Sequence, residues 1–405
     1  MKILHVNVVY AVGSTGKIVY DIHKSLIDKG YESIVLYGRE KKVKEPNVYK
    51  TSTQMAVVYN ALKSRVTGIP YAGSFFSTNR IIGIIKWEKP DIVHLHCING
   101  HFVNIKRLMC FLKENNIKTV LTLHAEFMHT GSCPHAFDCE RYMTGCGKCP
   151  YLWDATKSYF FDFTAYAWRR MKSAFEGFNN LIIVASSEWI LSRAQKSPIT
   201  KDFEFCVIKN GIDTENIFKP VPFEHLKEKH KLKDEKILLH VTANFDDPVK
   251  GSKYFVELAR KLDGDNIKIL LVGRNVQDAH LPDNVIAVGG IYDQKELAAY
   301  YSMADLFVIT SVRETYPTVC IEAVSCGTPV VGFDTGGVKE TIPEGMGMAV
   351  EAYSVDKLHE AVLEYIDKKD SIPKEVKEEA RYRNSKERMA RDYLKVYTEL
   401  YNRKI

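Results

Sequence analysis

Short apolar runs alternate with amphipathic stretches along almost the whole chain. The apolar runs are rich in β-branched residues and fall into two series: 2–9, 33–37, 91–96, 118–123 and 181–185, then 236–242, 267–273, 305–310 and 328–333. Most of the segments between them place apolar residues at helical spacing. Strands that alternate with helices in this way predict parallel sheets covered by helices on both faces. We therefore expect an α/β protein with two Rossmann-like, doubly wound domains.

The two series are separated by residues 207–222, where turn residues and prolines interrupt the periodicity. We expect an N-terminal domain over residues 1–210 and a C-terminal domain over residues 211–384. Residues 385–405 carry a helical stripe of apolar side chains. This last segment is predicted to be a helix that packs back toward the N-terminal domain.

Composition narrows the class of protein. The 405 residues are 45% hydrophobic and 26% charged, which is ordinary for a globular enzyme. No apolar run has the length of a membrane span, and the opening MKILHVNVVY has no basic leader, so we expect a cytoplasmic protein without a signal peptide. The net charge of +6 is too mild for a nucleic-acid binder but is compatible with an anionic membrane surface.

The segment from Ser311 to Gly337 carries two glutamates, Glu314 and Glu322. It follows a predicted strand, and its helix is expected to have Pro317 as its first residue. A helix start at the carboxyl end of a parallel strand offers N–H groups and a positive dipole end that suit a phosphate, while carboxylates suit hydroxyls. The segment therefore predicts a site for a diphosphate that carries a sugar on each side.

A glycine-containing loop follows the first predicted strand. Gly13 and Gly16 allow backbone to approach a ligand closely, and Ser14 or Thr15 is expected to cap the next helix. The spacing does not fit a nucleotide-binding Walker loop, because only two residues separate the glycines. A tight structural turn and a loop that lines a ligand site are both open interpretations.

Polar residues also lie at or after the ends of other predicted strands. Lys250 closes the loop after the strand 236–242 and is placed to neutralise a diphosphate, although a lone lysine there would more often be a solvated loop residue. His124 ends the strand 118–123 and is predicted to face a ligand. His94 and His96 share one side of the previous strand, and for them a satisfied core role is favoured over ligand contact.

Four cysteines lie in a glycine- and proline-rich loop over residues 131–150: Cys133, Cys139, Cys146 and Cys149. Thiols with this spacing can reach one tetrahedral centre, so a structural zinc is one interpretation. Unliganded packing cysteines and two disulfides are the alternatives, and a reducing compartment disfavours the disulfides. On each interpretation the loop is scaffold and takes no part in chemistry.

Residues 151–178 are rich in aromatic side chains, and within this range the aromatic cluster is followed by the basic residues Arg169, Arg170 and Lys172. The mixture is typical of a membrane interface. Aromatic packing inside the first domain is the alternative, and it is favoured because the apolar positions do not form one stripe.

Taken together, these stretches resemble the retaining glycosyltransferases of family 4, which have the GT-B fold: two Rossmann-like domains facing a cleft. The resemblance covers nearly the whole chain. It is carried by GSTGKI at residue 13, PDIVHLHCINGHFVN at 90, TLHAEF at 122, VKG at 249 and the double-glutamate segment. The nearest group looks like the capsule and exopolysaccharide transferases related to the colanic acid enzymes.

The resemblance implies roles in the C-terminal domain. Glu314 would hold the hydroxyls of the donor sugar, and Glu322 would hold the ribose of the nucleotide. Lys250 and the backbone N–H groups of Thr318 and Val319 would bind the diphosphate.

The resemblance also implies roles in the N-terminal domain. Gly13 and Gly16 would lie beside the donor, and His124 would contact the transferring sugar near its leaving bond. Retention would follow from a same-face attack in which the leaving phosphate takes the acceptor's proton. Catalysis would then need no metal or other cofactor, because Lys250 and a helix dipole stabilise the leaving group.

Two departures from the family pattern bear on the site. An arginine that many relatives carry before the lysine of VKG is absent from residues 242–247, and Arg313 and Arg274 are the candidates to replace it. Ala125 stands where close relatives commonly have Asp after the histidine, which affects the expected orientation of His124.

The expected function is transfer of a hexose or N-acetylhexosamine from a nucleotide-sugar, a UDP-sugar, to a saccharide or polyprenyl-diphosphate-linked acceptor in surface polysaccharide biosynthesis. The enzyme is expected to work in the cytoplasm, at the inner face of the membrane, with no nucleic-acid partner. Two alternatives stay open: a nucleotide-sugar epimerase of the same fold, and a catalytically silent nucleotide-sugar-binding module.

Overall fold

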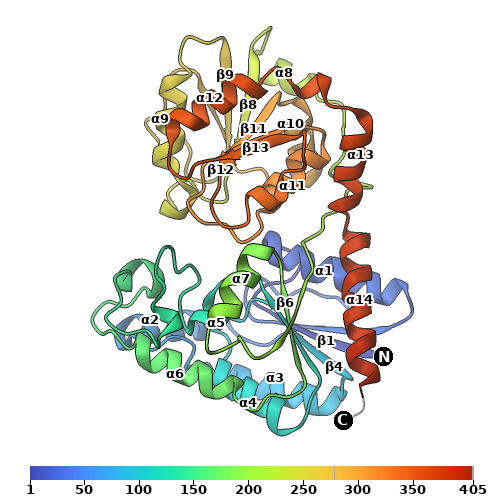
Figure 1. Ribbon diagram of the computed structural model, residues 1–405. Helices are drawn as coiled ribbons and strands as arrows, with labels where there is room; N and C mark the ends of the chain where they lie inside the picture. Colours follow the sequence, from blue (N-terminus) through green and yellow to red (C-terminus); the bar gives the residue numbers. More distant parts are fainter. Residues whose placement is uncertain (278, 404–405) are drawn as a thin grey trace. The chain divides into compact units, whose positions relative to one another are not determined.

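Two parallel sheets, each covered by helices on both faces, form the framework of the protein (Figure 1). The computed structural model describes residues 1–277 and 279–403. The chain divides into unit 1, which holds Met1–Lys209 and Met389–Ile405, and unit 2, which holds Asn210–Arg388. The predicted α/β class with two doubly wound parallel sheets is confirmed.

Unit 1 contains a seven-stranded sheet in the order β3-β2-β1-β4-β5-β6-β7, in which every neighbouring pair is parallel. Its central strands are buried along almost their whole length, as expected for strands covered on both faces. The strands are β1 Lys2–Asn7, β2 Glu32–Tyr37, β3 Val48–Lys50, β4 Ile92–Leu95, β5 Thr119–Leu123, β6 Leu181–Ala185 and β7 Glu204–Val207.

The helices of unit 1 form two layers. One face of the sheet packs against α1 and α14, and the other packs chiefly against α3, α4, α6 and α7. Figure 1 shows the red helix α14 in the same part of the fold as the blue α1. The bounds are α1 Gly13–Asp28, α2 Gln54–Thr67, α3 Phe75–Glu88, α4 Ile105–Glu114, α5 Phe127–Thr130, α6 Thr164–Phe175, α7 Glu188–Lys196 and α14 Lys386–Asn402.

Unit 2 contains a six-stranded sheet in the order β10-β9-β8-β11-β12-β13, again parallel throughout. Helices α8, α10, α11 and α13 cover one face, and α9 and α12 cover the other. The strands are β8 Lys236–Val241, β9 Ile267–Val272, β10 Val285–Gly289, β11 Leu306–Ile309, β12 Val330–Phe333 and β13 Gly347–Val350. The helices are α8 Glu224–His230, α9 Ser252–Lys261, α10 Gln294–Met303, α11 Thr318–Ser325, α12 Val355–Tyr365 and α13 Lys374–Arg383.

Among the described residues, five short helical turns complete the elements. They are η1 Arg141–Met143, η2 Leu152–Thr156, η3 Pro248–Lys250, η4 Lys339–Thr341 and η5 Lys369–Ser371. None of the helices in residues 1–277 and 279–403 combines the length and the apolar character needed to cross a bilayer.

Two expectations about helix starts are wrong. Helix α1 begins at Gly13 with Val12 before it and no side-chain cap, so Ser14 and Thr15 lie inside its first turn. Pro317 has extended backbone and precedes α11, whose first residue is Thr318. Both errors concern only the first residues of a helix. The two helices themselves form where the spacing of apolar residues predicts them.

Candidate functional site

Lys250 and Glu314 come together at the carboxyl ends of two adjacent strands of unit 2. Lys250 ends the turn η3 after β8, and Glu314 lies in the loop between β11 and α11. Because β8 and β11 are neighbours in the sheet, their loops meet at one edge. Lys250 Nζ donates a hydrogen bond to Glu314 Oε1 at 2.7 Å, and both side chains are largely buried.

The loop that carries Lys250 is fixed by its own residues. The Asp247 side chain accepts a hydrogen bond from the amide of Val249 at 3.0 Å and caps the turn. Gly251 has a φ of +72°, and a Cβ there would lie 1.9 Å from the carbonyl oxygen of Thr310. Only glycine fits this contact, so the loop is held closely against the end of β11.

Lys250 remains charged at neutral pH. Burial alone would lower its pKa, but the Glu314 carboxylate, which is both a nearby charge and a hydrogen-bond partner, and Asp247 outweigh burial and raise the pKa. A fixed cation at the carboxyl edge of a parallel sheet is suited to an anionic ligand.

The backbone of Glu314 is held by two glycines after β12. The amide of Gly337 donates to the carbonyl oxygen of Glu314 at 2.8 Å. Gly336 has a φ of +65°, and a Cβ there would lie 1.8 Å from the same oxygen. The role of this glycine pair was not predicted from the sequence, and its position shortly after a buried strand was the available signal.

Helix α11 places the remaining predicted residues of unit 2. Thr318 and Val319 form its first turn, where amide N–H groups have no partner within the helix. Glu322 lies about one turn further along, and its Oε2 accepts a hydrogen bond from the Tyr301 hydroxyl at 2.9 Å. Burial, together with the Glu322 charge, raises the pKa of Tyr301 well above its ordinary value, so this hydroxyl stays protonated and donates. Tyr301 was missed because an aromatic residue in a buried helix usually indicates only packing.

The side chain of Arg274 is hydrogen-bonded to the loop that precedes Lys250. Its side chain is exposed, and its Nε donates to the carbonyl oxygen of Ala243 at 2.9 Å. Arg313 is partly buried and stands next to Glu314 in the chain. Either position remains a prediction for the second phosphate-binding cation.

In unit 1, three imidazole rings form a hydrogen-bonded chain that ends at His124. His5 Nδ1 lies 3.2 Å from His96 Nε2, and His96 Nδ1 lies 3.3 Å from His124 Nε2. His5 and His96 are fully buried, whereas His124 is partly exposed. Burial lowers the pKa of His5 to about 3 and that of His124 to about 4, so these rings are neutral at pH 7.

The buried end of this chain determines which nitrogen of His124 carries the proton. His5 Nε2 has no hydrogen-bond partner among the described residues. An unpaired buried N–H costs more than an unpaired acceptor, so His5 carries its proton on Nδ1 and donates to His96. His96 then donates to His124 Nε2, which leaves the proton of His124 on Nδ1. His124 is thus held as a neutral hydrogen-bond donor.

His94 has the core role that the sequence favoured. Its Nδ1 lies 2.6 Å from the Tyr397 hydroxyl, and its Nε2 lies 2.7 Å from Thr122 Oγ1. Thr122 in turn lies 3.0 Å from the Tyr393 hydroxyl. These contacts fasten α14 to the sheet of unit 1.

The buried histidines predict a specific loss of stability in mild acid. An unfolded histidine has a pKa of about 6.5, so below that pH the unfolded chain binds more protons than the folded one. Each neutral buried histidine should cost about 1 kcal/mol of unfolding free energy by pH 6, and the loss continues toward the folded pKa. All four tryptophans lie in unit 1, so tryptophan fluorescence can follow its denaturant midpoint. A midpoint that stays constant from pH 7.5 to 5.5 would contradict this assignment.

Gly13 and Gly16 differ in their surroundings. Gly13 is exposed, has a φ of +63° and has no atom near the position of a Cβ. Gly16 is buried, and a Cβ there would lie 3.0 Å from Val9 Cγ2. Gly16 therefore serves close packing of α1 on its own turn, and Gly13 is the glycine left at the surface.

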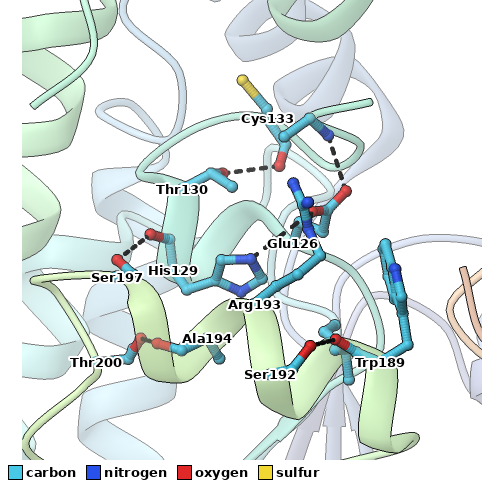
Figure 2. Close-up of polar contacts among 12 residues, drawn as sticks. Glu126, His129, Thr130, Cys133, Trp189, Ser192, Arg193, Ala194, Ser197 and Thr200 are labelled. Carbon is cyan, nitrogen blue, oxygen red and sulfur yellow. Dashed lines mark hydrogen bonds and ion pairs between the residues drawn. The ribbon is translucent and has the colours of Figure 1, made fainter. Parts of the chain in front are cut away.

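Glu126, two residues after His124, is fully buried, and its carboxylate is bound by neighbouring side chains (Figure 2). Its Oε1 accepts from Arg193 Nε at 2.6 Å, and its Oε2 accepts from the amide of Ala136 at 2.8 Å. Burial alone would raise the pKa of Glu126, but the contacts with His129, Arg193 and the Ala136 amide lower it to about 2. This carboxylate joins α7 to the cysteine-containing loop and is not available to a ligand.

The four loop cysteines line one small cavity of about 20 Å³: Cys133, Cys139, Cys146 and Cys149. In the described part of the chain, a group of three potential metal ligands lies within 4.8 Å of one another. It consists of ring nitrogens of His5, His94 and His96, not of the cysteine sulfurs. The four sulfurs are therefore gathered but more widely spaced than that trio.

Helix α2 presents an exposed apolar face that sequence analysis did not identify. The face consists of side chains that are 42% to 82% exposed and spaced along one side of the helix: Met55, Val58, Tyr59, Leu62 and Val66. The segment after η2 packs near the end of this helix, where the amide of Tyr159 donates to the carbonyl oxygen of Arg65 at 2.8 Å. Five aromatic residues of η2 and of the segment after it are 40% to 69% exposed: Trp153, Tyr159, Phe160, Phe161 and Phe163. Interior packing, the favoured interpretation of these aromatic residues, is therefore wrong for these five, because the segment lies on the outside of the unit.

Comparison with known proteins identifies both halves of the chain. Residues 15–216 match the family model described as Glycosyltransferase Family 4, and residues 222–384 match Glycosyl transferases group 1. Sucrose-phosphate synthase from Thermosynechococcus elongatus has a similar fold, with a TM-score of 0.72, 18% identity and 99% of each chain covered. Anabaena HepE, solved in complex with UDP and glucose, has a TM-score of 0.68 and 17% identity over 98% of this chain and 100% of its own.

The chain belongs to the glycosyltransferases with the GT-B fold. It is 25% identical over 381 residues to the putative colanic acid biosynthesis glycosyl transferase WcaC of Escherichia coli K12, covering 88% of this chain and 89% of that protein. It is 23% identical over 351 residues to N-acetyl-alpha-D-glucosaminyl L-malate synthase of Bacillus anthracis, covering 83% and 79%. The protein is thus a glycosyltransferase related to enzymes of polysaccharide biosynthesis, as the resemblance predicted.

Proposed function

We propose that the protein is a retaining glycosyltransferase that moves a hexose or N-acetylhexosamine from a UDP-sugar to a lipid-linked saccharide. The observation that carries the donor half of this proposal is the Lys250–Glu314 pair, with a separation of 2.7 Å, in loops that adjoin the start of α11. A cation, first-turn amides and carboxylates are the groups needed to bind a diphosphate and the hydroxyls on either side of it. The Anabaena relative in complex with UDP and glucose supports uridine as the base.

In unit 2, each group has a proposed task. Lys250 and the amides of Thr318 and Val319 bind the diphosphate and stabilise the negative charge that it gains as the glycosidic bond breaks. Glu314 accepts hydrogen bonds from the sugar hydroxyls, and Glu322, held by Tyr301, accepts them from the ribose. Stabilising donors of this kind contribute about 3 to 4 kcal/mol each to lowering a barrier.

In unit 1, His124 is the proposed donor to the transferring sugar. A neutral ring that presents Nδ1–H can donate a hydrogen bond to an oxygen without acting as a base. Glu126 cannot act as a covalent nucleophile, because Arg193 and the Ala136 amide occupy its two oxygens. This favours a same-face attack, in which the leaving phosphate accepts the proton of the attacking hydroxyl, over the two-carboxylate route of retaining hydrolases. Such a route assigns no step to a metal ion.

A screen of nucleotide-sugars by mass spectrometry, with detection of hydrolysis and transfer, tests the assignment. We expect turnover of a UDP-sugar by the natural protein, and a loss of about 100-fold or more in Glu314→Ala with folding intact. Glu344→Ala, an exposed glutamate of the same unit, is the control and should be unaffected. Equal turnover by natural protein and Glu314→Ala would contradict the proposed role.

The screen also separates the alternatives. An epimerase of this fold would interconvert two nucleotide-sugars without an acceptor, and a silent binding module would bind without turnover. The stereochemistry of the product, read by NMR, tests retention: an inverted anomeric centre would exclude the same-face route.

We further propose that the acceptor is amphiphilic and is reached at a membrane surface. The apolar face of α2 supports this, since exposed apolar side chains beside the basic Lys63 and Arg65 match the interface of an anionic bilayer. A cavity of about 240 Å³ lies against the same helix, and Asn60, Lys63 and Tyr71 are among its lining residues. Polar and aromatic groups of this kind suit the saccharide portion of the acceptor.

Vesicle flotation tests the membrane proposal. The double variant Met55→Ser with Leu62→Ser should bind phosphatidylglycerol vesicles about tenfold more weakly, because two exposed apolar side chains are lost from the contact. Leu363→Ser, which removes an exposed leucine from α12 of unit 2, is the matched control and should bind normally. Equal binding by the double variant would exclude this face as the docking surface.

A further inference from the structure

The loop between α5 and α6 gathers four thiols from distant positions around one cavity. Cys133, Cys139, Cys146 and Cys149 all line the same cavity of about 20 Å³, and none of them is in a disulfide. We propose that this cavity binds one Zn²⁺ ion through the four thiolates, as a structural site separate from the proposed sugar-transfer chemistry.

The backbone around the last two cysteines is wound tightly. Four consecutive residues, Gly145 to Lys148, have positive φ angles of 116°, 59°, 93° and 47°. Cys146 and Lys148 adopt this conformation although it is unfavourable for residues with a side chain. The turn is fixed from outside, because Gly147 donates to Thr164 Oγ1 at 3.0 Å and the Cys149 amide donates to Asp162 Oδ2 at 2.6 Å.

The sulfurs have few protein partners of their own. Cys146 Sγ makes a long contact of 3.6 Å with the carbonyl oxygen of Thr130. A backbone N–H from Tyr151 is directed at the Cys149 sulfur.

Four sulfur ligands in tetrahedral geometry are characteristic of zinc or iron, and zinc is the ion of sites with this ligand set and no redox role. Zn–S bonds of about 2.3 Å place the sulfurs about 3.8 Å apart. Among the described residues, no three of these sulfurs all lie within 4.8 Å of one another, so metal binding must draw them inward. The loop should therefore contract when it takes up metal.

The histidine trio is the competing metal site, and its nitrogens are already used. Both ring nitrogens of His94 are engaged by Tyr397 and Thr122, and both nitrogens of His96 bridge to neighbouring rings. A metal bound by these histidines would break their hydrogen bonds. A metal bound by the four thiols would displace few hydrogen bonds, such as the long contact of Cys146 Sγ with Thr130.

The loop is coupled to the neighbourhood of His124 through Glu126. The Ala136 amide, inside the loop, donates to Glu126. Arg193 of α7 holds the same carboxylate (Figure 2). Thr130 Oγ1 also donates to the carbonyl oxygen of Cys133 at 2.9 Å. Between α5 and α6 the described chain has only the short turns η1 and η2, so a metal ion would supply the rigidity that regular structure provides elsewhere.

Metal content of the full-length protein, purified without chelators under reducing conditions, tests the site. We expect about one zinc per chain in the natural protein and in Cys110→Ser, which removes a cysteine of α4, and less than about a tenth of that in Cys146→Ser. If Cys146→Ser fails to fold, the natural protein still decides the matter: a chelator should release zinc, expose the loop thiols to a thiol reagent and speed proteolysis between α5 and α6.

Substitution with Co²⁺ should give the absorption of a tetrahedral thiolate site. Sub-stoichiometric zinc, stoichiometric iron, or intact disulfides in the mass spectrum would each overturn the proposal. Zinc retained by Cys146→Ser but lost on replacing His94 would assign the metal to the histidine trio and would also overturn it. None of these outcomes depends on sugar transfer, so failure here is distinguishable from failure of the proposed function.

Discussion

Lys250→Ala is expected to lower kcat/KM for the UDP-sugar by about 100-fold to 1,000-fold, which corresponds to about 3 to 4 kcal/mol of transition-state stabilisation. The negative charge on the leaving diphosphate is greatest in the transition state, so most of the loss should appear in kcat. Lys250 is the charged group whose loop is fixed by Asp247 and Gly251, so no neighbouring side chain can take its place without rebuilding that turn. Steady-state kinetics with the donor identified by the screen provide the measurement.

Lys253→Ala is the matched control, because Lys253 is an exposed lysine three residues further along the same segment. It should retain activity within about twofold, as expected for a surface substitution away from the site. The melting temperature of Lys250→Ala should be recorded too, since the substitution leaves Glu314 without its ion partner. A rate loss below about threefold in a folded Lys250→Ala protein would remove the lysine from the proposed mechanism.

Gly336→Ala is expected to destabilise unit 2 by about 2 to 4 kcal/mol and to weaken donor binding at the same time. The alanine would need a positive φ, and its Cβ would lie 1.8 Å from the carbonyl oxygen of Glu314. Relieving that overlap must shift the loop that carries Glu314. Thermal unfolding followed by circular dichroism, together with calorimetric titration of UDP, measures both effects.

Gly345→Ala is the control that separates the cost of a left-handed backbone conformation from the cost of steric overlap. Gly345 has a φ of +80° and no atom within 4 Å of a Cβ. It should cost only the left-handed conformation of an alanine, about 1 kcal/mol, and leave UDP affinity unchanged. If both variants lose equal stability and both bind UDP normally, the contact between Gly336 and Glu314 does not position the site.

The strands that could not be predicted share one physical feature. The strands missed from the sequence are β3, β7, β10 and β13, and they are the edge strands of the two sheets. An edge strand pairs on one side only and is partly exposed, so it lacks the continuous apolar run of a central strand. The buried strands between them were predicted to within about two residues because burial on both faces requires that run.

Some residues of the site could be predicted from the sequence and others could not. Lys250 and Glu314 were recognised because each lies in a loop that follows a predicted strand and has clear local signals. Their 2.7 Å contact depends on β8 and β11 being neighbours, which the sequence does not state. Tyr301 and His5 could not be found, because an aromatic residue in a buried helix and a histidine inside an apolar strand indicate core packing. Their roles depend on which groups they meet from other elements.

The apolar face of α2 was missed for a different reason. Its spacing is that of an amphipathic helix, but the same spacing predicts a helix that packs on a core. Only the exposure of Met55 and its neighbours shows that the face points outward. Sequence periodicity defines a face of a helix, and the fold determines what that face meets.

The central claim is that the diphosphate of the donor binds between Lys250 and the first turn of α11. A crystal structure of the protein with an intact, non-transferable UDP-sugar analogue tests it most directly. We predict phosphate oxygens within about 3 Å of Lys250 Nζ and of the Thr318 or Val319 amide, with Glu314 turned from the lysine toward the sugar hydroxyls. A diphosphate bound elsewhere, with the Lys250–Glu314 ion pair still closed, would contradict the account.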